Sequence, residues 1–274
     1  MMLLYYYFRI MTIFLYFVPF EVIDFISMIV GNIIFLSNNW RVKSISDNLK
    51  RIGIENFDVK KVFINMTRNH LDLLKFYYMN KNYLLKLTDF SEVSLKEIQN
   101  DKYVLVTAHY GNWELGGMIF GFLVEKSVTV AEFEGVGEKR YEILKRFRGR
   151  TGMKVLPLED LSTGAKIEEL IQKGYIPVLL FDRDINKTGS LSDFGKSKVY
   201  IPKGPFYFSK KYSRKILFAA IYYEKNERFR YKVKIYEIER DENLRKYANN
   251  GLNKLYEVIE NKPEEWFAFS MRWE

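Results

Sequence analysis

The chain has 274 residues, of which 48% are hydrophobic, and a formal net charge of +9. This length and composition suffice for one domain with a full hydrophobic core, with or without an appendage. The absence of cysteine excludes disulfides, thiolate metal sites and a cysteine nucleophile, and two histidines are too few for a typical histidine-based metal site. We therefore expect neither a metal nor a bound cofactor. The positive charge indicates an acidic partner, which could be nucleic acid, anionic lipid, a phosphorylated cofactor or an acidic protein.

The first 36 residues are mostly apolar, with charges only at Arg9, Glu21 and Asp24. The densest apolar run, residues 10–20, is too short to span a bilayer. The segment is either a pair of helices lying in the bilayer interface or a buried helical hairpin. We favour the first, because the apolar residues occupy all helix faces and basic residues follow them. Residues 1–38 are thus predicted to be a membrane-associating segment.

The rest of the chain, residues 39–274, is predicted to form a single α/β domain. Residues 39–100 are helical and amphipathic, and strands alternate with helices from residue 101 onward. Strands are predicted over residues 103–107, 128–131, 154–156 and 176–181, and helices over 114–124, 138–150 and 162–173. Two later strands, 216–223 and 231–238, differ because apolar residues alternate with Lys232 and Lys234 in the second, as in a half-exposed antiparallel edge. We expect a mixed, mainly parallel central sheet flanked by helices.

A short polar cluster separates the strand at residues 103–107 from the following helix. His109 stands at the strand's C-terminal tip, Asn112 is a suitable N-cap, and Glu114 falls in the first helical turn. With a turn between them, Glu114 could bind one imidazole nitrogen and leave the other as a base. The alternative is that His109 ends a strand and Glu114 only stabilises a helix N-terminus.

Other polar clusters extend this candidate site. Asp182, Arg183 and Asp184 end another predicted strand, and sites in open α/β sheets form at such carboxyl ends, although a salt-bridged turn would give the same pattern. His70 has no carboxylate five positions on, so we expect a structural role for it. Residues 196–215 carry seven basic side chains and no acid, which suits a membrane, carrier or nucleic-acid surface. No nucleic-acid-binding motif supports the last of these.

The order of these clusters matches a known family. His109 to Glu114 resemble the catalytic block of the bacterial lipid A late acyltransferases, the lauroyl/myristoyl family that includes phosphatidylinositol mannoside acyltransferase. The later blocks match it in order: Arg148 with Gly152, Met153 and Pro157; Asp182, Arg183 and Asp184 with Asp193, Phe194 and Gly195; Ile201 to Pro205; and Pro263 to Trp266 with Arg272 and Trp273. The chain departs from the family pattern at two places, and these bear on the identity of the acyl chain or of the acceptor. Phe194 stands alone where the family has two phenylalanines, and Phe206 to Phe208 replace small residues.

The resemblance implies an O-acyltransferase with a glycerolipid-acyltransferase-like fold. It would move a fatty acyl chain from an acyl thioester, on acyl carrier protein or coenzyme A, to a hydroxyl of a membrane glycolipid or lipid A-type precursor. His109 would be the general base and Glu114 its orienting acid. Substrate-binding residues would be Asn112, Arg148, Asp182, Arg183, Asp184, Lys203 and Gly204. The expected location is the cytoplasmic face of the inner membrane, on an anionic surface.

Two alternatives remain open. The chain could be a non-catalytic protein that binds anionic membranes or nucleic acid on an acyltransferase scaffold. It could also be an acyl thioesterase, in which water replaces the acceptor hydroxyl. We favour the transferase and expect no nucleic acid as a partner.

Overall fold

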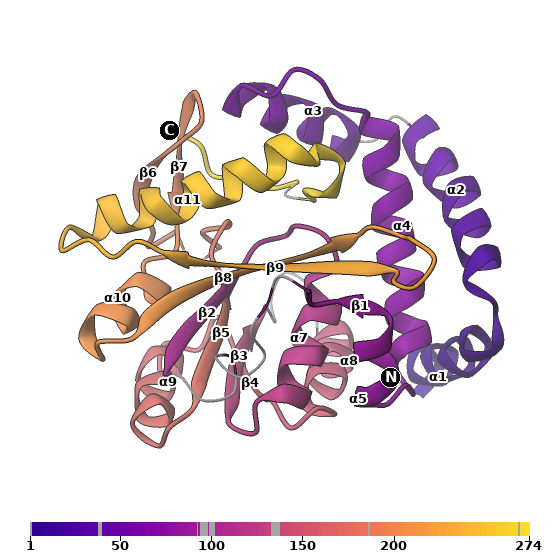
Figure 1. Cartoon of the computed structure of the whole chain (residues 1–274), viewed down its shortest axis with the longest axis horizontal. Coiled ribbons are helices and arrows are strands. Elements are labelled where there is room, and N and C mark those ends of the chain that lie inside the picture. The colour runs from indigo at the N-terminus through magenta and orange to yellow at the C-terminus, as the bar shows by residue number, and fades with distance from the viewer. Residues whose placement is uncertain are drawn as a thin grey trace.

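The computed structural model describes residues 2–37, 40–91, 93, 98, 102–132, 138–185, 187–267 and 269–274. Within them, a seven-stranded mixed sheet forms the centre of the molecule (Figure 1). Its strands, in spatial order, are β1 (Thr88–Asp89), β9 (Tyr231–Ile238), β8 (Lys215–Tyr223), β2 (Tyr103–Thr107), β5 (Ile176–Leu180), β3 (Ser127–Ala131) and β4 (Lys154–Pro157). The run from β8 to β4 is parallel, so the carboxyl ends of these strands share one edge.

Helices cover both faces of the sheet. The C-terminal half contributes α7 (Trp113–Leu123), α8 (Glu138–Gly149), α9 (Thr163–Gln172), α10 (Gly204–Lys211) and α11 (Leu244–Asn261). Successive residues of β2 point to opposite faces, as a strand requires. Val104 and Val106 join the core beneath α10 and α11, whereas Tyr103 and Leu105 join the core beneath α7. The sheet is therefore buried on both sides, which explains why β2 and β5 are continuous apolar runs.

The predicted α/β class and the predicted strands are confirmed, with bounds that differ by at most one residue. The antiparallel pairing of β8 with β9 is confirmed as well. The prediction that β9 is an edge strand is wrong, because β1 pairs with it in parallel through Tyr231 and Lys232. A separate hairpin of β6 (Ser190–Phe194) and β7 (Ser197–Ile201) was not predicted. β1 has only two residues, and β6 is short and polar, so neither gives a periodic signal. Part of the predicted helical region 39–100 lies outside the described residues.

The N-terminal half is helical, with α1 (Met2–Phe17), α2 (Phe20–Leu36), α3 (Trp40–Ile52), α4 (Val59–Phe76) and α5 (Lys81–Lys86). α1 and α2, joined at Val18 and Pro19, each pack on α4 at the periphery of the molecule (Figure 1), and the two helices together are referred to below as the N-terminal hairpin. The buried face of α2 consists of Ile23, Ser27 and Gly31, spaced one turn apart. Lys75 of α4 donates hydrogen bonds from Nζ to three carbonyls at the end of α1, those of Leu15, Tyr16 and Val18, at 2.7–3.2 Å.

The outer face of this hairpin is apolar and exposed. Its exposed large side chains are Tyr6, Tyr7, Ile10, Ile13, Phe14, Tyr16, Phe17, Val22, Phe25, Met28, Ile29, Val30, Ile33 and Leu36. One face of the segment is therefore buried against the protein and the other is exposed, and its association with a membrane stays a prediction. Among the described helices, none is by itself long and apolar enough to cross a membrane, although α2 and α3 pass that test as a pair bent by 90°.

The close packing of α2 on α4 gives a first prediction. A Cβ added at Gly31 would lie 2.6 Å from the Ile64 Cα atom, which is closer than side-chain carbons approach a backbone. Gly31→Val should therefore push the helices apart and lower the free energy of unfolding by about 1–3 kcal/mol, as overpacking does. Thermal unfolding measures this, with Ile33→Val on the exposed face of α2 as the control. Equal midpoints for the two variants would contradict the close packing.

Candidate active site

A histidine and an aspartate meet where two neighbouring strands end. β2 and β5 pair in parallel, with Thr107 opposite Leu180, so the chain leaves both strands at the same edge. His109 and Asp182 follow these strands directly. The Asp182 carboxylate accepts a hydrogen bond from His109 Nδ1 at 2.8 Å and another from the His109 backbone amide at 2.9 Å. The convergence expected at the carboxyl edge of the sheet is thus present as a direct contact.

Asp182 stays ionised although it is buried, and this decides which nitrogen of His109 carries the proton. Its side chain has no exposed surface, and Trp266 Nε1 lies 3.4 Å from Oδ2 as a further donor. Burial alone would raise the pKa of Asp182, but the charge of His109 and the hydrogen bonds from its ring and backbone outweigh burial and hold the pKa below its usual value. Asp182 is therefore a carboxylate that can only accept. The Nδ1 atom of neutral His109 must carry the proton, which leaves the Nε2 lone pair available as a base.

Backbone hydrogen bonds fix the loop that carries His109. The His109 carbonyl accepts from the Phe267 amide at 2.7 Å, and the Gly111 amide donates to the Glu265 carbonyl at 2.7 Å. Gly111 has a φ of +59°, and a Cβ on it would lie 1.8 Å from the Ile221 carbonyl oxygen. Only glycine fits here, because both the dihedral angle and the contact with β8 exclude a side chain.

Glu114 does not orient the imidazole as predicted. Its carboxylate forms a bidentate pair with Arg148, with Nη2–Oε1 at 2.5 Å and Nε–Oε2 at 3.0 Å. Arg148 Nη1 also donates to the Val130 carbonyl at 2.8 Å. Both side chains are largely buried, and although burial alone would raise the pKa of Glu114, Arg148 holds it below its usual value. The first turn of α7 is thereby fixed to α8 and to the end of β3. Asp182 takes Nδ1 because it lies on the adjacent strand.

Asn112 is the N-cap of α7, as predicted. Its Oδ1 atom accepts from the Leu115 amide at 3.1 Å. The Nδ2 group donates to the Tyr231 hydroxyl at 3.2 Å, and the residue is only 2% exposed. These contacts occupy the Asn112 side chain within the protein, so the substrate-binding role expected for it stays a prediction without a contact to support it.

A cleft of about 840 Å³ opens beside His109. The predicted site residues that line it are His109, Glu114, Arg148, Arg183, Asp184, Lys203 and Gly204. Arg183 Nη1 lies 3.5 Å from His109 Nε2, and Arg183 Nε is buried without a hydrogen-bond partner among the described residues. Such an orphaned donor beside the base is suited to an anion or a developing negative charge. Arg148, by contrast, has its donors engaged by Glu114 and Val130.

Two further residues line the cleft. Asp184 is a predicted site residue whose contacts are structural, and His70 is not among the predicted site residues. The Asp184 carboxylate accepts from the amides of Thr188 and Gly189 and from Arg272 Nη1 at 2.7 Å, so it closes a turn and holds the C-terminal segment. His70, which we expected to be only structural, lines the cleft from α4 with its Nδ1 atom 2.7 Å from the Met66 carbonyl. No local pattern could have placed His70 there, because the packing of α4 against the sheet edge is a tertiary contact.

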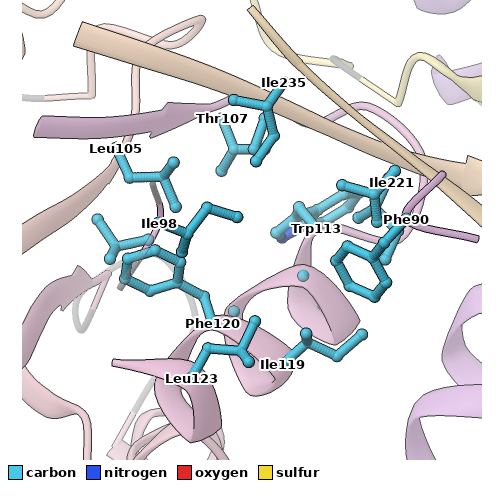
Figure 2. A pocket seen from close by; sticks show the side chains of 15 residues that line it. Phe90, Ile98, Leu105, Thr107, Trp113, Ile119, Phe120, Leu123, Ile221 and Ile235 are labelled. Atoms are coloured by element: carbon cyan, nitrogen blue, oxygen red, sulfur yellow. The ribbon is translucent and has the colours of Figure 1, made fainter. Parts of the chain in front are cut away.

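A second hollow, almost entirely apolar, lies between α7 and the sheet (Figure 2). Its lining residues include Phe90, Ile98, Leu105, Gly117, Phe120 and Ile235. Trp113 lines both this hollow and the cleft, and its ring meets that of His109 edge to face with centroids 5.2 Å apart. The apolar hollow therefore begins at the side chain next to His109.

The basic segment 196–215 does not present a continuous cationic surface. Five of its six lysines pair with carboxylates of other parts of the chain: Lys196 with Glu55, Lys198 with Glu274, Lys210 with Glu242, Lys211 with Glu168, and Lys215 with Glu237. Arg214 is buried and donates to the carbonyls of Tyr175 and Ile171. The positive charge of this segment is thus largely paired with nearby carboxylates, which weakens the argument for a nucleic-acid or carrier surface there.

The fold and the site define a class: an α/β protein with a histidine–aspartate pair at the carboxyl edge of a mainly parallel sheet, facing a deep cleft. Comparison with protein families gives the particular assignment. The family model described as bacterial lipid A biosynthesis acyltransferase matches residues 2–274, and the chain belongs to this family. It is accordingly a member of an acyltransferase family that acts on lipid A-type substrates. Among curated individual proteins, the comparison gives no match.

The C-terminal segment that bonds to the His109 loop yields a prediction on stability. Glu265 is 3% exposed, and burial raises its pKa to about 8, against a partly compensating effect of Arg68, Lys262 and Lys61. The folded chain therefore keeps a proton on Glu265 that the unfolded chain releases near its ordinary pKa of 4.5. Between these values the unfolded state binds fewer protons, so this group lowers stability as pH rises.

Glu265→Gln cannot ionise and should remove that loss. We expect its unfolding midpoint to be nearest to that of the parent near pH 5, to exceed it increasingly up to about pH 8, and to keep a constant lead above that pH. Thermal unfolding across this range provides the measurement. A difference between the two proteins that does not change with pH would show that Glu265 is already ionised in the folded state.

Proposed function

We propose that the protein transfers a fatty acyl chain from an acyl thioester to a hydroxyl of a membrane glycolipid or lipid A-type precursor, with His109 as general base. The observation that carries this proposal is the His109–Asp182 pair, in which His109 lines the cleft together with Arg183 and Lys203. Family membership supplies the reaction class, and the geometry supports the roles of the residues.

In the proposed reaction, His109 Nε2 takes the proton of the acceptor hydroxyl, and the oxygen attacks the thioester carbonyl. The tetrahedral intermediate collapses with cleavage of the C–S bond, and the imidazolium returns the proton to the leaving thiolate. Asp182 keeps the ring in the correct tautomer and stabilises the imidazolium. No covalent enzyme intermediate is needed, so both substrates occupy the cleft together.

The negative charge that develops on the carbonyl oxygen needs a donor. The two backbone amides just before α7 are already engaged, because the Gly111 amide donates to the Glu265 carbonyl and the Asn112 amide to the Ile221 carbonyl, both at 2.7 Å. Arg183 is the better candidate, because its guanidinium adjoins His109 Nε2 and has an unpaired donor. The cleft also contains Lys203, which could bind a phosphate of the acceptor or of the donor.

The apolar hollow behind Trp113 is the proposed site of the acyl chain. Its walls are carbon, it lies within the sheet–helix layer, and it begins beside His109. A thioester carbonyl at the His109 Nε2 atom would therefore have its alkyl chain directed away from water. Burying such a chain contributes about 0.8 kcal/mol per methylene.

The N-terminal hairpin is the proposed membrane contact. Its exposed apolar face suits the bilayer interface, and Arg41, Lys43, Lys50 and Arg51 follow it in the sequence. α4, on which the hairpin packs, contributes His70 and Leu73 to the cleft. This arrangement favours a location on the cytoplasmic face of the inner membrane, where a lipid acceptor and a thioester on acyl carrier protein or coenzyme A are both accessible.

The direct test is incubation of the protein with a radiolabelled acyl thioester and a bacterial lipid extract, followed by separation of the products. A new labelled glycolipid that is absent with His109→Ala would support the proposal. Labelled free fatty acid alone would assign a thioesterase instead. No movement of label from either donor would favour a non-catalytic binding protein.

Asp182→Asn separates the two carboxylates of the site. We expect kcat to fall by about 10²- to 10⁴-fold, because the amide can neither stabilise the imidazolium nor hold the productive tautomer. Steady-state kinetics with a saturating donor measure it. Glu114→Gln should instead act mainly on stability, since it breaks a largely buried ion pair and costs roughly 3–5 kcal/mol. Near-normal kcat in Asp182→Asn would overturn the assignment of the dyad.

The apolar hollow predicts a change of chain-length preference. A Cβ at Gly117 would meet no atom within 4 Å, so a larger side chain there projects into open space in the hollow. Gly117→Leu should favour shorter acyl donors by about 10-fold or more in relative kcat/KM, a difference of two or three buried methylenes. Gly149→Leu, at a helical glycine that also meets nothing within 4 Å but lies outside the hollow, is the control. An unchanged preference would exclude the hollow as the acyl site.

A further inference from the structure

A buried network of charged and polar side chains connects the N-terminal hairpin to the loop that carries His109. It begins at Asp24 of α2, whose carboxylate accepts from Arg230 Nη2 at 2.7 Å and Nη1 at 3.1 Å. Arg230 also donates to Asp72 of α4, from Nε at 2.7 Å and Nη2 at 3.1 Å. The Tyr231 hydroxyl donates to the same Asp72 carboxylate at 2.6 Å. Hairpin, α4 and β9 thus meet at one set of hydrogen bonds.

The network reaches the catalytic loop at two points. The Tyr231 hydroxyl accepts from Asn112 Nδ2 at 3.2 Å, and Asn112 caps α7 three residues after His109. Asn69 of α4 lies 3.4 Å from the same hydroxyl and donates from Nδ2 to the Gly111 carbonyl at 3.0 Å. Both atoms that the network binds therefore belong to the turn between His109 and the helix.

A second branch leads from Asp24 to the other side of that turn. Arg68 Nε donates to Asp24 at 3.0 Å, and its Nη1 donates to Asn65 Oδ1 at 2.6 Å. Asn65 Nδ2 in turn donates to the Glu264 carbonyl at 3.2 Å. The next carbonyl along the chain, that of Glu265, accepts the Gly111 amide. Asp24 is consequently the common origin of contacts on both sides of Gly111.

The charges and burial of this network make it rigid. Asp24 and Asp72 balance Arg68 and Arg230, and the side chains of Asp72 and Arg230 are 0% and 4% exposed. Burial alone would lower the pKa of Arg230, but Asp72 and Asp24 raise it, so the guanidinium stays charged. A buried polar network in which every member is paired fixes one arrangement, because any displacement leaves a charge unpaired in a low dielectric.

We propose that Tyr231, Asp72 and Arg230 are positioning residues for the catalytic loop, and that Asp24 makes the α1–α2 hairpin part of this positioning device. The inference rests on the proposed role of His109 and extends it. None of these side chains lines the cleft; they act on His109 through Asn112 and Gly111. Substitutions of these residues should lower kcat and leave KM nearly unchanged, because a small displacement of a catalytic group slows the reaction without weakening substrate binding.

Tyr231→Phe is the mildest test, since it removes one hydroxyl and keeps the buried ring. We expect kcat for acyl transfer to fall by about 10-fold or more, with KM for the thioester within about two-fold of the parent. Tyr247→Phe is the matched control: Tyr247 is also fully buried, and its hydroxyl contacts Ser209 Oγ at 2.9 Å beneath α10. An equal kcat in both variants would overturn the proposal.

A second readout does not depend on activity. The chain has two histidines, so selective ¹⁵N labelling of histidine gives imidazole signals from His70 and His109 alone. We expect the His109 signals to move in Tyr231→Phe and to stay in place in Tyr247→Phe. A change no larger than that of the control would overturn the positioning role. If the protein failed to transfer acyl groups at all, these spectra would still decide the inference separately.

The role of the N-terminal hairpin in positioning is tested with the Asp24→Asn variant, measured below the unfolding temperature of that variant. We expect the His109 signals to move in the same direction as in Tyr231→Phe. Ser27→Ala is the control, because Ser27 lies on the buried face of α2 and its hydroxyl donates to the Ile23 carbonyl of its own helix, at 2.7 Å, outside the network described here. Unchanged His109 signals in Asp24→Asn would remove the hairpin from the device and confine positioning to α4 and β9.

Discussion

The site depends on the burial of one carboxylate. Asp182 has no exposed surface, so its two oxygens must be satisfied by protein donors. Those donors are the ring and backbone of His109 and the indole of Trp266, which come from two chain segments outside the strand that carries Asp182. Satisfying Asp182 therefore requires β2, β5 and the C-terminal segment to assemble together. The same contacts that pay this desolvation cost direct Nε2 of His109 to the cleft.

Much of the fold follows from local patterns, and the site follows only in part. Apolar runs bounded by turns are sufficient to identify β2, β5, β8 and β9, because burial on both faces leaves a strong signal in the sequence. The partner of His109 is different. It depends on β5 lying next to β2, although β3 and β4 come between them in the chain. No local pattern contains that spatial order. Local reasoning therefore pairs His109 with Glu114, the carboxylate nearest in sequence, whereas Asp182 accepts the hydrogen bond from His109 Nδ1.

Charge in the sequence is likewise an incomplete guide to charge on the surface. The basic segment 196–215 has no acid of its own, yet acids from α3, α9, β9 and their flanking loops pair with its lysines. The apolar N-terminus shows the opposite case. Its outer face stays exposed, while its few charged residues include Asp24, which is directed inward to Arg68 and Arg230. In both segments the role of a charge is set by tertiary neighbours.

The close approach of Gly111 to β8 bears on how chains of this kind should be classified. Within the block from His109 to Glu114, Gly111 is required by space, Asn112 by the helix start, and Glu114 by the ion pair with Arg148. A divergent chain could retain all of them for folding while losing the carboxylate that corresponds to Asp182. Such a chain would match the motif and yet lack the dyad. Whether a relative can form the histidine–aspartate pair is therefore decided at the position after β5, far in the sequence from the block between His109 and Glu114.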